Sequence, residues 1–158
     1  MFSQDDSRCG VLTVRRHRLT AGGVQPVGAV QHGFEWFYGD GAVAPTTGER
    51  FFLELPYPKA AMGQLFIDAL AQAVPDSLNL LLLDHSGAHT AQRLRWPENV
   101  RYVWLPPYCP ELSPIERVWR DVKDDVAWRQ CPDLDAQQHA VGDLFCAYEA
   151  TTLQSLTG

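Results

Sequence analysis

The sequence has no long hydrophobic run and no basic leader ahead of an apolar segment. No apolar stretch of its 158 residues approaches the roughly 18 residues that cross a bilayer. It also has no Cys-x-x-Cys spacing, because its four cysteines are scattered at positions 9, 109, 131 and 146. These absences argue against a membrane partner, a zinc site and a disulfide framework, and they predict a cytoplasmic protein with reduced thiols.

Positive charge is also scarce. The 13 Lys and Arg residues are outnumbered by 19 Asp and Glu, which gives a net charge of −6. A module that binds nucleic acid over its whole surface would be basic, so any such contact must be local. The densest basic cluster is Arg15-Arg16-His17-Arg18. Phosphate contact and a solvated turn explain this cluster equally well.

The first half of the chain predicts antiparallel strands. The segments Val27–Gln31, Glu35–Val43 and Arg50–Leu55 are rich in Val, Phe, Tyr and Trp. Pro45–Gly48 has the composition of a turn between the last two. Asp40-Gly41 is an alternative hairpin turn, but the later turn leaves two strands of matching length. A meander of antiparallel strands is the simplest interpretation.

The second half predicts strands and helices in alternation. Apolar residues at helical spacing predict a helix over Ala60–Val74. The run Leu78–Leu83 is almost continuously apolar, which is typical of a strand covered on both faces and parallel to a neighbour. A short helix near Thr90–Leu94 and a strand over Val100–Leu105 follow.

The last segments predict helices. Ser113 is suited to be an N-cap, Pro114 follows it at the first helical position, and Glu116 lies three residues after the cap. This capping box predicts a helix that runs to about Trp128. A final amphipathic helix follows, and residues 151–158 are expected to fray. This order predicts an α/β chain with the ribonuclease H-like fold, in which three antiparallel strands and then parallel strands form a mixed sheet flanked by helices.

Two carboxylates have positions suited to chemistry. Asp84 directly follows the buried strand, where ligands gather in open α/β sheets, although a cap in the next loop is the alternative. Glu116 lies 32 residues later, in a first helical turn beyond a stiff proline loop. The capping box would explain Glu116 on its own. Together the two carboxylates indicate a divalent-metal site.

The sequence around both carboxylates resembles one family. Leu83–His89 and Leu105–Trp119, with the string Pro-Pro-Tyr-Cys-Pro-Glu-Leu-Ser-Pro-Ile-Glu-Arg-Val-Trp, closely resemble the catalytic domain of bacterial insertion-sequence transposases of the mariner-like DDE superfamily. Gln4-Asp5-Asp6-Ser7 is similar to the family's Gln-Asp-Glu-Ser. The resemblance covers residues 2–129 of the printed sequence.

The resemblance implies that Asp5, Asp84 and Glu116 are the catalytic metal ligands, with Asp40 as the alternative to Asp5. Three converging carboxylates repel one another unless cations are present. Two Mg²⁺ or Mn²⁺ ions would satisfy them and support phosphodiester displacement. The implied reaction is hydrolysis at a transposon end, followed by attack of the freed 3′ hydroxyl on target DNA.

The candidate DNA contacts are Arg15, Arg16, Arg18, His89 and Lys123. His89 matches a histidine of the family motif, and a helix-start histidine bonded to backbone is equally consistent. Lys123 lies seven residues after Glu116 and therefore on the same helix face, although a solvated lysine is the simpler explanation. The expected partners are transposon ends, target DNA and a second copy or full-length transposase, with the protein on the nucleoid when it is bound to DNA.

The predicted organisation is a catalytic domain over residues 1–130 and a helical extension and tail over 131–158. Family members carry helix-turn-helix segments ahead of the catalytic domain, whereas this chain starts four residues before Asp5. We therefore expect an N-terminally truncated transposase domain whose first strand is clipped to about Phe2–Asp5. The competing interpretations are an inactive remnant that only associates with full-length transposase and a general ribonuclease H-like nuclease.

Overall fold

The computed structural model describes residues 1–11, 19–25, 27–28, 31, 33–56, 60–84, 94–107, 109, 112–127 and 129–158. The strands of these segments are β1 (Phe2–Gly10), β2 (Trp36–Val43), β3 (Arg50–Leu55), β4 (Asn79–Leu83) and β5 (Val100–Trp104). Their helices are α1 (Ala60–Ala73), α2 (Ile115–Asp125), α3 (Leu134–Ala147) and α4 (Ala150–Thr157).

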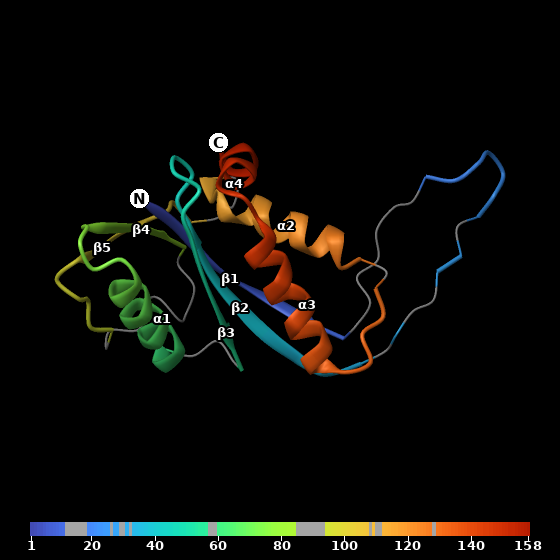
Figure 1. The fold of residues 1–158 in the computed structure, drawn as a ribbon, viewed down its shortest axis with the longest axis horizontal. Coiled ribbons are helices and arrows are strands. Elements are labelled where there is room, and N and C mark those ends of the chain that lie inside the picture. The colour runs from blue at the N-terminus through green and yellow to red at the C-terminus, as the bar shows by residue number, and fades with distance from the viewer. Residues whose placement is uncertain are drawn as a thin grey trace.

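The strands form a mixed sheet in the order β3-β2-β1-β4-β5 (Figure 1). β1 pairs antiparallel with β2 from Ser3 opposite Val43 to Gly10 opposite Trp36. On its other side β1 pairs parallel with β4, and β4 pairs parallel with β5. Three antiparallel strands followed by parallel strands is the predicted ribonuclease H-like arrangement, so the predicted fold class is confirmed. The first strand is not clipped at Asp5, because β1 continues to Gly10.

The predicted strand over Val27–Gln31 is wrong for the residues of that segment that the structure describes, 27, 28 and 31. Both edges of β2 are already occupied, one by β1 and the other by β3. No described residue of the segment therefore pairs with β2 as a strand, and Val27 remains 90% exposed. β1 supplies the first antiparallel strand in its place. Most of the short helix predicted near Thr90–Leu94 lies outside the described residues.

The sheet separates two apolar clusters (Figure 1). α1 packs Phe66, Ile67 and Leu70 against one face, together with Leu81 and Leu83 of β4. The opposite face is covered by α2, α3 and α4, whose buried residues form a second cluster with β1 and β2. Each face thus has its own core, and the side-chain alternation of β1 and β2 determines which core a residue joins.

The glycines of β2 allow α2 to pack closely against the sheet. A Cβ at Gly39 would lie 2.7 Å from Phe52 Cε2 and 3.0 Å from Trp119 Cη2. A Cβ at Gly41 would lie 3.2 Å from the side chains of Ile115 and Trp119. β2 runs straight through these positions, so the alternative hairpin turn at Asp40-Gly41 does not form. The glycines instead make room for the buried indole of Trp119.

The turn between β2 and β3 lies where Pro45–Gly48 predicted it. Gly48 adopts φ +72°, which favours glycine, and its N–H donates to Ala44 O at 2.8 Å. The backbone of Ala150 in α4 approaches this glycine so closely that a Cβ would collide with it. The turn is therefore also the docking point of the last helix.

The C-terminal residues form a helix, which corrects the frayed tail expected for residues 151–158. Leu153 is fully buried in the cluster that contains Trp119 and Phe145. Gln154 Nε2 donates to Thr46 O at 2.7 Å. The sequence of this polar end segment does not reveal the helix, because tertiary contacts hold it in place. These contacts are the burial of Leu153 and the hydrogen bond to a turn that lies 108 residues earlier.

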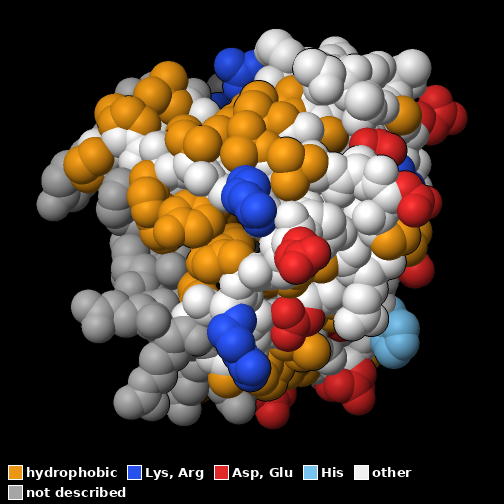
Figure 2. Space-filling model, turned by 90° about the vertical axis from the view of Figure 1, so that its left-hand side faces the viewer, with side chains coloured by type: hydrophobic (Ala, Val, Ile, Leu, Met, Phe, Trp, Pro, Cys, Tyr) orange, Lys and Arg blue, Asp and Glu red, His pale blue; other side chains and the backbone are white. Residues whose placement is uncertain are grey.

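β5 forms one edge of the sheet in the described part of the chain. The centroid of the Tyr102 ring on β5 lies 4.3 Å from the ring centroid of Trp96 and 5.2 Å from that of Trp104. Figure 2 shows hydrophobic side chains gathered on this side of the molecule, and Tyr102 and Val103 are among the exposed ones. None of the helices in the described segments is long and apolar enough to cross a membrane.

If α4 belongs to the core, Leu153→Ala should lower the free energy of unfolding by roughly 2–5 kcal/mol, the cost of emptying a buried leucine site. Leu78→Ala is the matched control, because it makes the same truncation at a side chain that is 67% exposed. Urea unfolding followed by tryptophan fluorescence measures both. Equal effects of the two variants would contradict the docking of α4.

Candidate active site

β1 and β4 bring two of the predicted carboxylates to the same level of the sheet. The parallel register pairs Phe2 with Leu81 and Ser3 with Leu82. Continued along both chains, it sets Asp5 opposite Asp84, the residue that follows the last residue of β4. Parallel strands in register present paired residues on the same face. The two aspartates therefore lie at neighbouring positions.

The face that carries Asp5 is the one that α2 covers. Ser3 lies two residues before Asp5, and its Oγ lies 3.2 Å from Oγ of Ser113, just ahead of α2. Cys9, four residues after Asp5, belongs to the same buried cluster as Trp119 of α2. Since alternate residues of a strand share a face, Asp5 points to the side on which α2 begins. Glu116 occupies the first turn of that helix.

The electrostatics of Asp5 show that the carboxylates are near one another. Burial and then the negative charges of Glu116, Asp6 and Asp84 raise the pKa of Asp5 from 3.8 to about 8. The largest cause is burial, because a charge loses hydration there. The neighbouring carboxylates add repulsion of the same sign. Asp5 therefore keeps its proton near neutral pH unless a positive charge arrives.

Asp40, the alternative to Asp5, lies on the opposite face of β2 and β1. Gln4 Nε2 donates to Asp40 Oδ1, and Ala42, two residues along β2, joins the cluster beneath α1. Burial, opposed by the Gln4 hydrogen bond, raises the pKa of Asp40 well above 3.8, and the charges of Asp6, Asp5 and Asp84 add to the rise. Asp40 is only 3% exposed. It is a buried acid paired with an amide, turned away from α2.

The predicted capping box at Ser113 is wrong. The Ser113 side chain makes no cap hydrogen bond, and the residue at the helix cap is Pro114. Ser113 Oγ instead meets Ser3 on β1, and Glu116 N–H reaches only the backbone oxygen of Ser113, at 3.1 Å. The exposed Glu116 carboxylate is therefore not engaged in starting its helix, so the capping explanation for it does not hold.

The carboxylates suit a divalent cation by their chemistry. Carboxylate oxygens are the ligands that Mg²⁺ and Mn²⁺ prefer, and the raised pKa of Asp5 marks negative charge that a cation would compensate. Among the described residues, no three His, Cys, Asp or Glu side chains are already positioned to hold one metal ion. The site is thus an electrostatic cluster whose side chains must converge further to coordinate a metal.

The predicted DNA contacts have different outcomes. Arg15, Arg16, Arg18 and His89 lie outside the described residues. Lys123 is near the end of α2, close to Cys9 of β1. Burial raises the pKa of the Cys9 thiol to about 11, the charge of Lys123 opposes this rise, and the charge of Glu54 adds to it.

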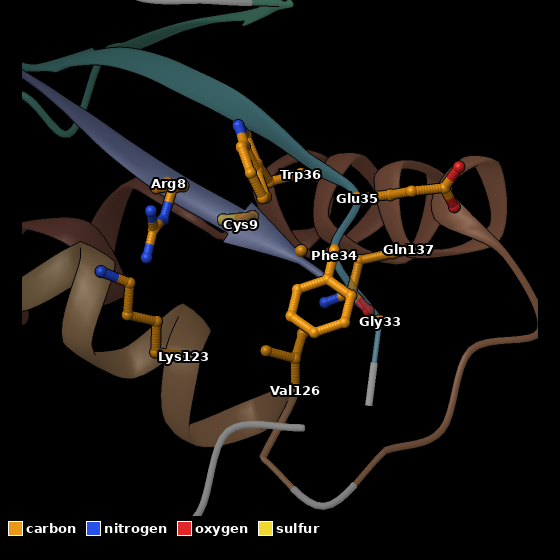
Figure 3. A pocket seen from close by; sticks show the side chains of 10 residues that line it. Arg8, Cys9, Gly33, Phe34, Glu35, Trp36, Lys123, Val126 and Gln137 are labelled. Atoms are coloured by element: carbon orange, nitrogen blue, oxygen red, sulfur yellow. The ribbon is translucent and has the colours of Figure 1, made fainter. Parts of the chain in front are cut away.

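Lys123 also lines a cavity of about 300 Å³ at the far ends of β1 and β2 (Figure 3). The other side chains of this cavity that could hold a ligand were not singled out from the sequence. They are Arg8, Phe34, Trp36 and Gln137. The only signal was Arg8 directly after the Gln4–Ser7 motif.

Comparisons with known proteins agree with this fold. The family model described as DDE superfamily endonuclease matches residues 1–137. Uncharacterized protein y4pE/y4sA of Sinorhizobium fredii is 36% identical over 91 residues, which are 57% of this chain and 67% of that protein.

Solved structures share the fold at low sequence identity. The Mos1 strand transfer complex has a TM-score of 0.76 at 14% identity, covering 99% of this chain and 50% of that one. Mos1 paired-end complexes, one with the left transposon end, one with Mn and one with Mg, have TM-scores of 0.75, 0.74 and 0.69. The chain thus spans about half the length of the Mos1 chains. The catalytic core domain of BIV integrase has a TM-score of 0.51 at 19% identity, over 94% of this chain and 84% of that one.

The raised pKa of Asp5 predicts how stability depends on pH. The folded state binds this proton more tightly than the unfolded chain, so the free energy of unfolding should fall as pH rises from about 4 to about 8. The slope from this group is at most about 1.4 kcal/mol per pH unit.

Asp5→Asn should remove this contribution, because the amide does not titrate. We expect urea unfolding without metal at pH 5, 7 and 8.5 to show that the free energy of unfolding of the variant increases relative to that of the parent as pH rises. The exposed Asp76→Asn is the control and should track the parent. If the free energies of unfolding of the parent and of Asp5→Asn depended on pH in the same way, the burial of a protonated Asp5 would be contradicted.

Proposed function

Since the chain belongs to the DDE superfamily endonucleases, we propose that it is the catalytic domain of a transposase, which cuts and rejoins DNA strands with divalent metal ions. The observation that carries the proposal is the electrostatic convergence of Asp5, Asp84 and Glu116 from three separate elements. A cluster of like charges that opposes folding is typical of a functional site. The family of the chain supplies the reaction class.

Asp5, Asp84 and Glu116 would hold two Mg²⁺ or Mn²⁺ ions, which when bound activate a nucleophile and stabilise the leaving oxygen of an in-line phosphodiester displacement. Asp5 gives up its proton when the cations are taken up. Asp84 reaches the site from the end of β4 and Glu116 from the exposed start of α2. The three side chains come from the middle of β1, the residue after β4 and the start of α2. The sheet and its cores fix the backbones of these elements, so only side-chain movement is needed to bring the carboxylates onto a metal.

Asp5 suits the role of first ligand better than Asp40 does. Asp40 is buried beneath α1 and hydrogen-bonded to Gln4, on the face opposite to that of Asp5. Withdrawing a proton from that environment would leave a buried charge without a cation beside it. Asp5 is partly exposed and shares its face with the start of α2.

DNA is the partner that this function requires. The substrates would be transposon ends and target DNA, as the Mos1 complexes with transposon-end DNA suggest by their fold. The net charge of −6 favours contact through local groups rather than the whole surface. The protein partner would be a second copy of the chain or a full-length transposase.

Metal binding tests the site directly. Titration with Mn²⁺ should raise the midpoint of thermal unfolding of the parent, by roughly 5–10 °C when the free ion is at about 100 times its Kd. Asp84→Asn and Glu116→Gln should show little of this shift, whereas Asp76→Asn should keep it. Equal shifts in all four proteins would rule out the carboxylate site.

The same proteins test the reaction. In Mn²⁺ or Mg²⁺ the parent should cut DNA duplexes that carry the repeats flanking its own gene, and Asp84→Asn should be at least about 100-fold slower, as for the loss of a group that stabilises the transition state. Preference for an RNA–DNA hybrid would indicate a general nuclease. Metal binding without cleavage of either would indicate an inactive remnant.

The identity of the first ligand has a separate test. Calorimetric titration of Mn²⁺ should show weaker binding by Asp5→Asn and unchanged binding by Asp40→Asn, because only Asp5 shares the face of Glu116. Thermal unfolding without metal checks that both variants are folded. Loss of binding in Asp40→Asn alone would assign the first ligand to Asp40.

A further inference from the structure

A cavity lies at the far ends of β1 and β2, away from the carboxylates. It has a volume of about 300 Å³ and lies between these strand ends, the end of α2 and the first turn of α3 (Figure 3). Such a volume is at the lower end of the range for small-molecule sites. Its lining combines aromatic rings, positive charge and a side-chain amide.

The first kind is exposed aromatic surface. Phe34 is 87% exposed and Trp36 is 48% exposed, and both line the cavity. Rings left in water at the rim of a cavity lose the apolar burial that would normally stabilise the fold. They offer flat faces on which another flat group can stack, as nucleobases do on aromatic side chains.

The second kind is positive charge. Arg8 and Lys123 both line the cavity, although the chain as a whole carries a net charge of −6. The guanidinium carbon of Arg8 lies 5.6 Å from the centre of the Trp36 ring. Neither cation forms an ion pair with another described residue, and Figure 3 shows the Glu35 carboxylate turned away from them. The cations are thus free to bind an anion such as a phosphate.

The third kind is a buried amide. Gln137 of α3 is only 7% exposed, yet its side chain lines the cavity and forms no hydrogen bond with any other described residue. In Figure 3 the amide points towards Phe34. Among the described residues, the buried polar atoms that lack any partner belong to Gln4 and Trp119, so the amide of Gln137 is open to the space of the cavity. It offers a donor and an acceptor side by side, the pattern that reads the edge of a base.

The cavity is linked to the carboxylates by two regular elements. Lys123 is seven residues along α2 from Glu116 and on the same helix face, and Arg8 is three residues along β1 from Asp5, with its side chain leaving the opposite face of the strand. The rise of a strand and of a helix makes both separations about 10 Å. The cavity is therefore within a few nucleotides of the position where a phosphodiester bond would react.

We infer that this cavity binds one unpaired nucleotide of the DNA substrate, next to the bond that is cut. Phe34 stacks on the base, Gln137 hydrogen-bonds its edge, and Lys123 and Arg8, which lies over the Trp36 ring, bind the adjoining phosphate. The inference rests on the proposed function, because it takes the DNA to be the substrate of the carboxylate site.

The test uses binding without metal, so that it does not depend on cleavage. The probe is a DNA duplex with a single unpaired 2-aminopurine, whose fluorescence is quenched when the base stacks. The parent should quench this probe and bind it about 10-fold or more tightly than the same duplex with an abasic site at that position. Phe34→Ala and Gln137→Leu should abolish both the quenching and the preference for the base.

Matched controls separate the cavity from general effects. Tyr102→Ala removes an exposed ring on β5 and should leave the preference intact, and Arg101→Gln removes an exposed cation there and should weaken binding less than Arg8→Gln. Equal affinity for the base-bearing and abasic duplexes would overturn the inference, as would a loss of preference in Tyr102→Ala.

The two proposals can fail separately. If Asp84→Asn leaves cleavage unchanged while the parent still selects the unpaired base, the metal site is wrong and the nucleotide cavity stands. If cleavage depends on Asp84 and the parent ignores the base, the cavity is wrong and the metal site stands. Free dAMP that binds as tightly as the duplex would also overturn the assignment to a DNA strand.

Discussion

The pairing of β1 with two different neighbours is the constraint on which the rest of the structure depends. On one side β1 is antiparallel to β2 along its whole length, and on the other it is parallel to β4 for only the pairs at Phe2 and Ser3. From Gln4 onward no described strand pairs with that edge of β1. Asp5 stands just past the point where the parallel pairing stops, and Asp84 just past the end of β4. Strand ends are where a sheet can present charged groups to solvent and ligands.

A buried carboxylic acid has different surroundings on the two faces of the sheet at β1 and β2. Asp40 is buried on the face of the sheet that α1 covers, and burial raises its pKa, while the amide of Gln4 donates a hydrogen bond that opposes the rise. Asp5 has a raised pKa too, but negative neighbours contribute to it and no side-chain amide is among its causes. Its environment disfavours the charged form without supplying a neutral partner. Such a conflict opposes folding, and a cation at the proposed metal site would resolve it.

The sequence was informative wherever a signal was local and periodic. The β-branched and aromatic composition of β2 and β3, the apolar run of β4 and the helical spacing of α1 all predicted elements that the structure contains. The placement of Asp84 after a buried strand and of Glu116 at a helix start was also correct. These features depend on neighbours within a few residues, so a single chain read from end to end reveals them.

The errors share a different cause. Ser113 was expected to cap its own helix, but its hydroxyl meets Ser3, which is 110 residues away. The last helix looked frayed because its anchor, Leu153, is buried by residues from other elements. The cavity was missed because Phe34, Gln137 and the other residues that line it come from separate segments, and each looks ordinary in its own. Tertiary contacts override local preference at these positions, and no periodicity records them.

The arrangement of α2 limits how far the cavity and the carboxylates can move relative to each other. Glu116 and Lys123 belong to one helix, and Val118, Trp119 and Val122 between them are buried against the sheet. Gly39 and Gly41 admit the Trp119 indole so closely that a shift of the helix along β2 would collide with the strand. A nucleotide held by Lys123 and Arg8 would therefore keep a fixed distance from Glu116 and Asp5. Binding energy from a group that does not react would then position the one that does, which is how a rigid scaffold converts affinity into orientation at the reacting bond.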